Sequence, residues 1–101
     1  MAKKPTRART ERRIEARRQA DLVRDREKLA RLQTGGAPER PIEVTSASVV
    51  EPSARATPCP LCGGALRVDE HAAEGGLRVV RAACVRCGAP RRIYFRLAAI
   101  N

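Results

Sequence analysis

Two cysteine pairs constrain the fold of this chain more than any other feature. Cys59 with Cys62 and Cys84 with Cys87 form two Cys-x2-Cys motifs separated by 21 residues, and a glycine directly follows each motif. In such a turn two thiolates converge on one metal ion at about 2.3 Å each, while the glycine lets the backbone adopt a left-handed conformation. The pattern therefore predicts one structural Zn²⁺ ion bound by all four cysteines.

Other uses of the four cysteines remain open at this level. Iron can bind the same thiolates, but the rubredoxin family resembles an acidic domain packed with aromatic residues, unlike this chain. A redox dithiol requires only one pair and is typical of a βαβ context, which the sequence does not indicate. Disulfides would suit an exported protein. We therefore interpret the four cysteines as ligands of one zinc ion, which uses both pairs and is compatible with a basic chain.

The N-terminal residues 1–7 are basic but are not followed by the apolar run of a signal peptide. No other stretch approaches the ~20 apolar residues of a membrane span. We therefore expect a cytoplasmic protein without a membrane span, and reducing conditions there favour metal binding over disulfides.

A metal ion would also compensate for a small hydrophobic core. The chain has 101 residues and is 43% hydrophobic, but much of that fraction is alanine, and only Tyr94 and Phe95 are aromatic. A module of about 45 residues seldom buries enough apolar surface by itself, whereas structural zinc contributes ~10–16 kcal/mol in comparable peptides. We expect the folded part of the chain to depend on its metal.

Alternating apolar and polar residues predict strands between and after the cysteine pairs. Leu66 and Val68 alternate with charged neighbours, Gly75-Gly76 offers a chain reversal, and residues 77–80 are rich in strand formers. A last strand follows the second cysteine pair. Its buried face is expected to carry Ile93, Phe95 and Leu97.

Residues 58–97 resemble the zinc ribbon family. The resemblance rests on the Cys-Pro-x-Cys-Gly motif at 59–63, the Cys-x-x-Cys-Gly motif at 84–88 and the strand-like segments around them. It implies a three-stranded antiparallel sheet clasped by one zinc ion. Zinc ribbons of this kind occur in ribosomal proteins, transcription factors and nucleic-acid enzymes, so the fold alone leaves the function open.

Composition divides the chain into three segments. Residues 1–34 read as a basic N-terminal arm and helix, with the helix spanning about 6–34, capped by Thr6 or Thr10 and stopped by Gly35-Gly36. Residues 35–57 are punctuated by Pro, Gly and Ser and read as a flexible linker, although Ile42–Val44 and Val49-Val50 suit short strands. Residues 58–101 form the expected zinc ribbon. The predicted fold is thus a small metal-stabilised β module preceded by one helix and a linker.

Positive charge is concentrated at the N-terminus. The chain carries a net charge of +10, and residues 1–18 alone hold eight basic groups against Glu11 and Glu15. Such a segment favours polyanionic partners, so RNA, DNA or a ribonucleoprotein is expected, although a solvated tail is the alternative. The candidate contacts in this segment are Arg7, Arg9, Arg12, Arg13, Arg17 and Arg18.

The last predicted strand offers a second nucleic-acid surface. Arg92, Tyr94 and Arg96 share the face opposite the buried one, so an aromatic ring between two guanidinium groups is available for a base and its phosphates. The alternative is an exposed edge strand whose charges prevent self-pairing. Four thiolates on Zn²⁺ leave a formal charge of −2, which lowers the +4 of residues 57–101 to about +2. The N-terminal segment should therefore dominate the attraction of a polyanion.

An apolar stripe on the predicted helix suggests a different partner. Leu22, Leu29 and Leu32 fall on one helical face, which charged residues interrupt too often for a coiled coil. This stripe would dock on a larger protein complex, and the chain would then be a protein-interaction adaptor.

Catalysis is not expected. Four thiolates fill a tetrahedral zinc site, whereas a catalytic zinc keeps one position open. The sequence shows no nucleophile paired with a base and no sign of a small-molecule substrate, and His71 is expected in an exposed loop. We expect a non-enzymatic binding protein.

Overall fold

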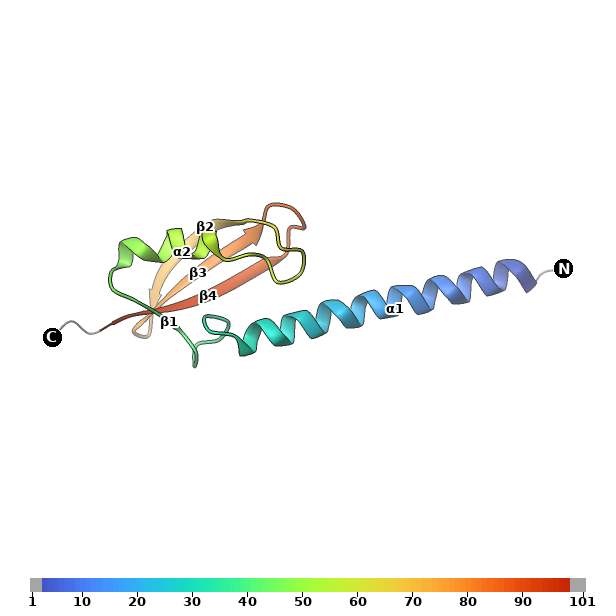
Figure 1. Ribbon diagram of the computed structural model, residues 1–101, viewed down its shortest axis with the longest axis horizontal. Helices are drawn as coiled ribbons and strands as arrows, with labels where there is room; N and C mark the ends of the chain where they lie inside the picture. The colour runs from blue at the N-terminus through green and yellow to red at the C-terminus, as the bar shows by residue number, and fades with distance from the viewer. Residues whose placement is uncertain (1–2, 99–101) are drawn as a thin grey trace.

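The computed structural model describes the backbone of residues 3–98 and the side chains of residues 8–98. Its long axis measures 76 Å, against 23 and 18 Å for the other two, because one long helix extends from a small mixed α/β unit (Figure 1). In chain order the elements are α1 (Lys3–Leu32), β1 (Ile42–Val44), a 3₁₀ turn (Ala47–Val49), α2 (Val50–Ala56), β2 (Leu66–Glu74), β3 (Leu77–Cys84) and β4 (Pro90–Leu97).

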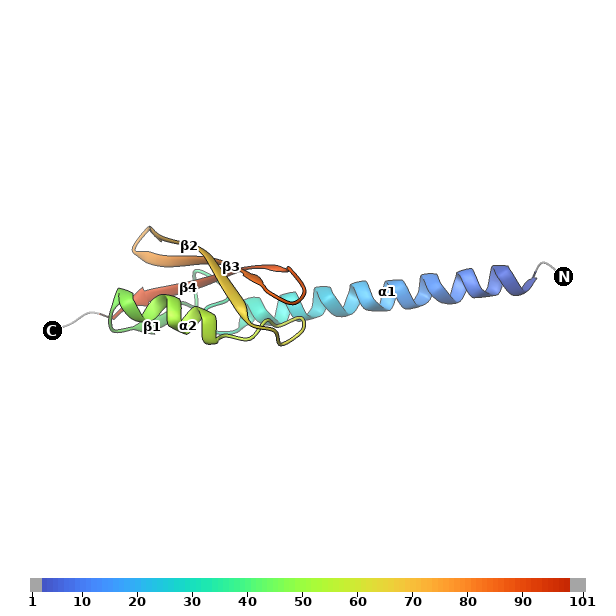
Figure 2. The same cartoon turned by 90° about the horizontal axis from the view of Figure 1, so that it is seen from above.

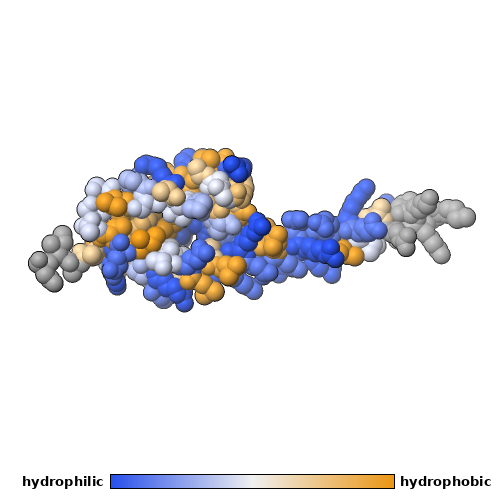
Figure 3. Space-filling model, viewed as in Figure 1, coloured by the Kyte–Doolittle hydropathy of each residue, from blue (hydrophilic) through white to orange (hydrophobic). Residues whose placement is uncertain are grey.

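The predicted N-terminal helix is confirmed as α1, with different ends. It begins at Lys3, before both Thr6 and Thr10, so the predicted caps are wrong. The good helix formers of residues 8–32 and pairs one turn apart, such as Gln19 Nε2 to Glu15 Oε1 at 3.1 Å, stabilise it locally. Every side chain from Arg9 to Arg26 is exposed. We call residues 3–25 of α1 the projecting arm, whose described side chains are largely hydrophilic in Figure 3.

The two glycines after α1 stop the helix, as predicted. Gly35 has a φ of 89°, which favours glycine. A Cβ on Gly36 would lie 1.9 Å from the carbonyl oxygen of Ala30, a distance that no side chain can occupy. The chain therefore turns sharply here and runs back along β4, where the Tyr94 amide donates to the Gly35 carbonyl at 2.9 Å.

The sheet has four strands rather than the three predicted. The order is β1-β4-β3-β2, in which β2, β3 and β4 are antiparallel, as expected, and β1 is added parallel to β4. The predicted reversal between β2 and β3 lies at Gly75 and Gly76, whose φ values are 56° and 82°. The fourth strand, Ile42–Val44, comes from the segment expected to be a linker, and its register places Glu43 beside Arg96.

Residues 35–57 are therefore not the flexible linker that we predicted. Beyond β1, they form the 3₁₀ turn and α2, which lies across one face of the sheet (Figures 1 and 2). Val50 and Ala54, one helical turn apart, are completely buried, and Val44 is 7% exposed. Pro52 is tolerated because it lies in the first turn of α2. These small apolar side chains contribute to the core from outside the predicted zinc ribbon.

The core lies between α2 and one face of β3 and β4. Val50, Val80 and Phe95 are its largest fully buried side chains. Ile93 is 3% exposed, so Ile93 and Phe95 lie on the buried face of the last strand, as predicted. Leu97 was also expected to be buried but is 38% exposed. The pairing of β4 with β3 ends at Phe95, so Leu97 has only the short β1 as a neighbouring strand. We call residues 26–98, including the last turns of α1, the compact unit.

Candidate metal centre and basic surfaces

The two cysteine motifs form two matching turns. Gly63 N–H donates to the Cys59 carbonyl at 2.7 Å, and Gly88 N–H donates to the Cys84 carbonyl at 2.9 Å. Both glycines have a φ of 75°, as the sequence predicted for the residue after each motif. The first turn precedes β2, and the second joins β3 to β4, so the antiparallel pairing of the sheet brings the two motifs to the same end.

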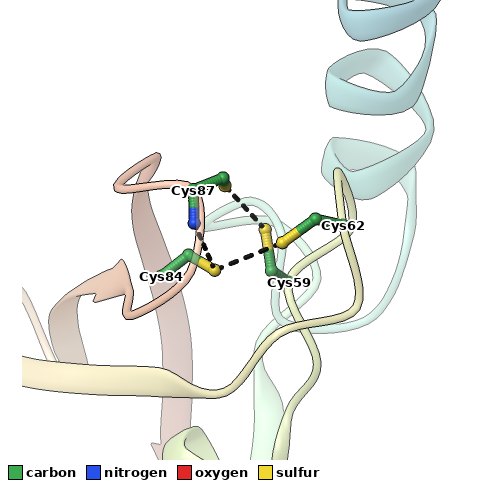
Figure 4. Close-up of side chains that lie close together, drawn as sticks. All are labelled: Cys59, Cys62, Cys84 and Cys87. Carbon is green, nitrogen blue, oxygen red and sulfur yellow. Dashed lines mark hydrogen bonds between the residues drawn. The ribbon is translucent and has the colours of Figure 1, made fainter.

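The four sulfur atoms converge on one point (Figure 4). They lie within 4.8 Å of one another, and two pairs join different turns: Cys59 to Cys87 at 3.8 Å and Cys62 to Cys84 at 3.4 Å. A tetrahedron of thiolates about 2.3 Å from a metal has edges of about 3.8 Å. A disulfide requires a separation of about 2.05 Å, and all four cysteines are free thiols. The arrangement can coordinate one metal ion.

The electrostatics of the cluster favour a cation. The Cys87 amide, followed by the Arg86 amide, donates to the Cys84 sulfur, and these bonds with those of neighbouring thiols outweigh burial and lower the pKa of Cys84 to about 6. The Ala89 amide lowers the pKa of Cys87, but burial and the three other cysteines outweigh it and raise that pKa to about 11. Four thiols so close together cannot all ionise without a compensating positive charge.

A glycine that the sequence analysis overlooked makes this approach possible. Gly64 is buried, and a Cβ on it would lie 2.9 Å from the Cys84 sulfur and 3.3 Å from the Cys62 sulfur. The second glycine of the Cys-x2-Cys-Gly-Gly sequence is therefore needed for space, whereas Gly63 is needed for its backbone conformation. Glycine doublets are common in loops, so the sequence alone did not distinguish these two roles.

Two arginines bridge the surroundings of the cluster. Arg86 Nη1 donates to the Cys62 carbonyl at 3.4 Å, which links the second turn to the first. Arg26 Nη1, from α1, donates to the Leu61 carbonyl at 2.6 Å. The end of α1 consequently lies beside the first turn (Figure 4), although the sequence predicted that the helix would be tethered through a linker. Both guanidinium groups bring positive charge to the turns that carry the four cysteines.

The basic residues predicted for nucleic-acid binding lie on the projecting arm. Their side chains are exposed along the helix, away from the compact unit (Figure 1). The structure describes five of the six predicted contacts, while the side chain of Arg7 lies outside the described residues. The described five are Arg9, Arg12, Arg13, Arg17 and Arg18.

The second predicted surface is only partly assembled. Arg92 and Tyr94 both line a hollow between α1 and β4, together with Arg31 of α1, which the sequence analysis did not include. Arg96 instead forms an ion pair with Glu43 of β1. The missed contribution of Arg31 depends on the fold-back at Gly35 and Gly36, which no local pattern around Arg31 reveals.

The predicted docking stripe is exposed to solvent. Leu22, Leu29 and Leu32 are 44%, 60% and 61% exposed, and they span the junction between the projecting arm and the compact unit. Their role in binding a partner remains a prediction.

His71 is not in an exposed loop, as we had expected. It lies within β2, its side chain is only 15% exposed, and Nδ1 lies 3.4 Å from a carboxylate oxygen of Glu51 on α2. Its Nε2 is buried without a hydrogen-bond partner among the described residues. The imidazole therefore packs between the sheet and α2.

No helix within residues 3–98 is both long enough and apolar enough to cross a bilayer. Comparison with known proteins adds no identity to these features: no protein family model, curated protein or solved structure shows a significant match to this chain.

Proposed function

We propose that this protein is a non-enzymatic, zinc-stabilised binding protein of the reducing cytoplasm, whose basic helix attaches to RNA, DNA or a ribonucleoprotein. The observation that carries the proposal is the projecting arm. It is a helix exposed on all sides and rich in arginine, and such a helix gains little from its own chain. A polyanion would supply the missing interactions.

Zinc is the proposed metal, in a zinc ribbon extended by β1 and α2. Four cysteine sulfurs with near-tetrahedral spacing suit Zn²⁺ in a structural site, and they leave no coordination position for a substrate. The metal would hold the two turns together, and its binding free energy would add to the stability of the sheet. Metal analysis of protein purified without added metal tests this assignment, with one zinc per chain as the expected result.

Salt dependence of nucleic-acid binding tests the role of the arm. Affinity for a labelled single-stranded oligonucleotide should fall with salt, with a slope of about −0.7 per neutralised phosphate. Deleting residues 1–18, which hold eight basic groups, should flatten that slope more than replacing Arg92 or Arg96. Circular dichroism of the truncated chain controls for folding of the compact unit. An unchanged slope after truncation would reject the proposed division between arm and sheet.

A second candidate is a protein-interaction adaptor, favoured by the exposure of Leu29 and Leu32 at 60% and 61%. Purification of the tagged protein with and without nuclease separates the two candidates. Partners that vanish after nuclease treatment and bind in a salt-sensitive way support the nucleic-acid function. A salt-tolerant protein complex that survives nuclease and is lost on Leu29→Asp supports the adaptor.

A further inference from the structure

The hollow between α1 and β4 combines an aromatic ring with unpaired positive charge. Its volume is about 280 Å³, and its walls come from the last turns of α1, residues 36–38 and the first half of β4. Figure 1 shows these three segments converging where α1 passes beneath β4. The side chains that determine its chemistry are Glu27, Arg31, Arg91, Arg92 and Tyr94.

The charges in this hollow are not balanced. Glu27 and Arg91 neutralise each other through an ion pair of 3.1 Å, with side chains that are 30% and 10% exposed. Arg31 and Arg92 both line the hollow, and neither guanidinium group has a hydrogen bond or an ion pair with another described residue. Two positive charges from different elements therefore face the same space without a carboxylate to satisfy them, which is the chemistry of an anion site.

Tyr94 supplies an aromatic wall. Its ring is half-buried and its backbone is fixed by the bond from its amide to the Gly35 carbonyl at 2.9 Å. The register pairs it with Val79, whose side chain is 5% exposed and supports this face of the sheet. A half-buried ring on a fixed backbone, which lines the same hollow as two guanidinium groups, is suited to stacking with a planar base.

We propose that this hollow binds one nucleotide of a single-stranded nucleic acid, with the base against Tyr94 and its phosphate between Arg31 and Arg92. The inference rests on the proposed function, and it adds one specific nucleotide site to the general electrostatic attraction of the projecting arm. We call this site the seat. A single strand is required because a base must leave its stack to lie on a protein ring.

A larger hollow of the compact unit is a poorer candidate. Its volume is about 530 Å³, and it also reaches Arg92, but its opposite wall carries Asp69 and Glu70. Arg81 there already pairs with Glu70 at 3.3 Å. These carboxylates would repel a phosphate, so the smaller hollow is favoured by charge although not by size.

The C-terminal end of the projecting arm lies close to this seat. Residues 9–18 lie 13 to 22 positions before Arg31, or about 20–33 Å along a helix. A strand that keeps the stacked spacing of duplex DNA, about 3.4 Å per nucleotide, covers that distance in roughly 6–10 nucleotides, and a more extended strand needs fewer. One strand of about 12 nucleotides can therefore contact the arm and place one base on Tyr94.

Binding of the full chain to a labelled 12-nucleotide DNA strand tests the seat, with an abasic strand of the same length as the comparison. Arg31→Gln and Tyr94→Leu should each weaken binding of the normal strand by about fivefold or more, since one base on one ring accounts for a factor of this size. Tyr94→Phe keeps the ring and should bind as the wild type does. On the abasic strand, Tyr94→Leu should have no effect.

Two controls make the experiment decisive. Arg55→Gln removes one exposed charge from α2, outside the hollow, and should change affinity less than twofold. Tyr94 is the only tyrosine and the chain has no tryptophan, so its intrinsic fluorescence reports on this site alone and should be quenched by the normal strand but not by the abasic one. Arg31 is exposed, which makes misfolding of Arg31→Gln an unsuitable explanation for lost binding.

The outcomes separate the seat from the arm. Suppose that deleting residues 1–18 abolishes binding, while Arg31→Gln and Tyr94→Leu leave the affinity unchanged and the strand does not quench Tyr94 fluorescence. The proposed nucleotide site is then rejected, and the proposed role of the arm is kept. Equal affinity of the wild type for normal and abasic strands leads to the same conclusion. Failure of the full chain to bind any strand at low salt overturns both proposals.

Discussion

The projecting arm and the compact unit are stabilised by different kinds of interaction. In the arm, the interactions are local, as in the ion pair from Arg24 to Asp21 at 3.1 Å, and the side chains remain in water. In the compact unit, residues far apart in sequence meet: Glu27 pairs with Arg91, Cys62 approaches Cys84, and Val50 packs under the sheet. The arm can therefore fray or bind without unfolding the unit, while the unit should fold as a whole or not at all.

Metal removal should produce the largest effect, and it should act on the compact unit alone. A structural zinc contributes ~10–16 kcal/mol in small domains, as much as the whole stability of an ordinary domain. We expect a chelator, or Cys84→Ser, to abolish the strand signal in circular dichroism and the dispersed amide signals of β2–β4. The helical signal of the arm should persist, apart from the last turns beside Leu61. A strand signal that survives full metal removal contradicts this dependence.

Truncation of Val50 tests whether α2 belongs to the compact unit. Val50 is completely buried and its neighbour Val49 is 40% exposed, so the two form a matched pair of adjacent valines. Val50→Ala should lower the free energy of unfolding of the protein by about 1.5–3 kcal/mol, and Val49→Ala by less than about 0.5 kcal/mol. Urea denaturation measures both. Equal, small effects would mean that residues 35–57 behave as a linker.

The same valines show why the sequence did not reveal half of the core. The cysteine spacing and the Gly75-Gly76 reversal are local signals, and they located the candidate metal ligands and the β2–β3 hairpin. By contrast, β1 has three residues and α2 has seven, too few to establish a period of two or of 3.6. Their conformation depends on the pairing of β1 with β4, 53 positions along the chain, and on the burial of α2 against β3. For the same reason Leu97 and His71 were misplaced.

Breaking the ion pair between Glu27 and Arg91 tests how firmly α1 joins the compact unit. Glu27→Gln leaves the Arg91 guanidinium, 10% exposed, without its counter-charge, and should cost about 1–2 kcal/mol of unfolding free energy. The matched control is Glu43→Gln, because the pair of Glu43 with Arg96 is more than half exposed and should contribute less than about 1 kcal/mol. Thermal denaturation compares the two variants. A smaller loss for Glu27→Gln than for the control would imply that the helix end is loosely attached.

The smallest effect on the compact unit should come from weakening the arm. Ala20 is exposed in the projecting arm, and Ala54 is completely buried in α2, so Ala→Gly at each position compares the two regions. Ala20→Gly should reduce helical content, since glycine costs about 1 kcal/mol in a helix interior, yet change unfolding of the sheet by less than about 0.5 kcal/mol. Ala54→Gly should lower the stability of the sheet by about 1 kcal/mol or more, because it also removes a buried methyl group.

Amide hydrogen exchange separates these two responses residue by residue. After Ala20→Gly, protection should fall only in the arm, and β3 should exchange at its original rate. A loss of protection in β3 of similar size would show that arm and unit unfold cooperatively. The arm would then be part of the fold, and its long exposed surface could no longer be explained by a partner alone.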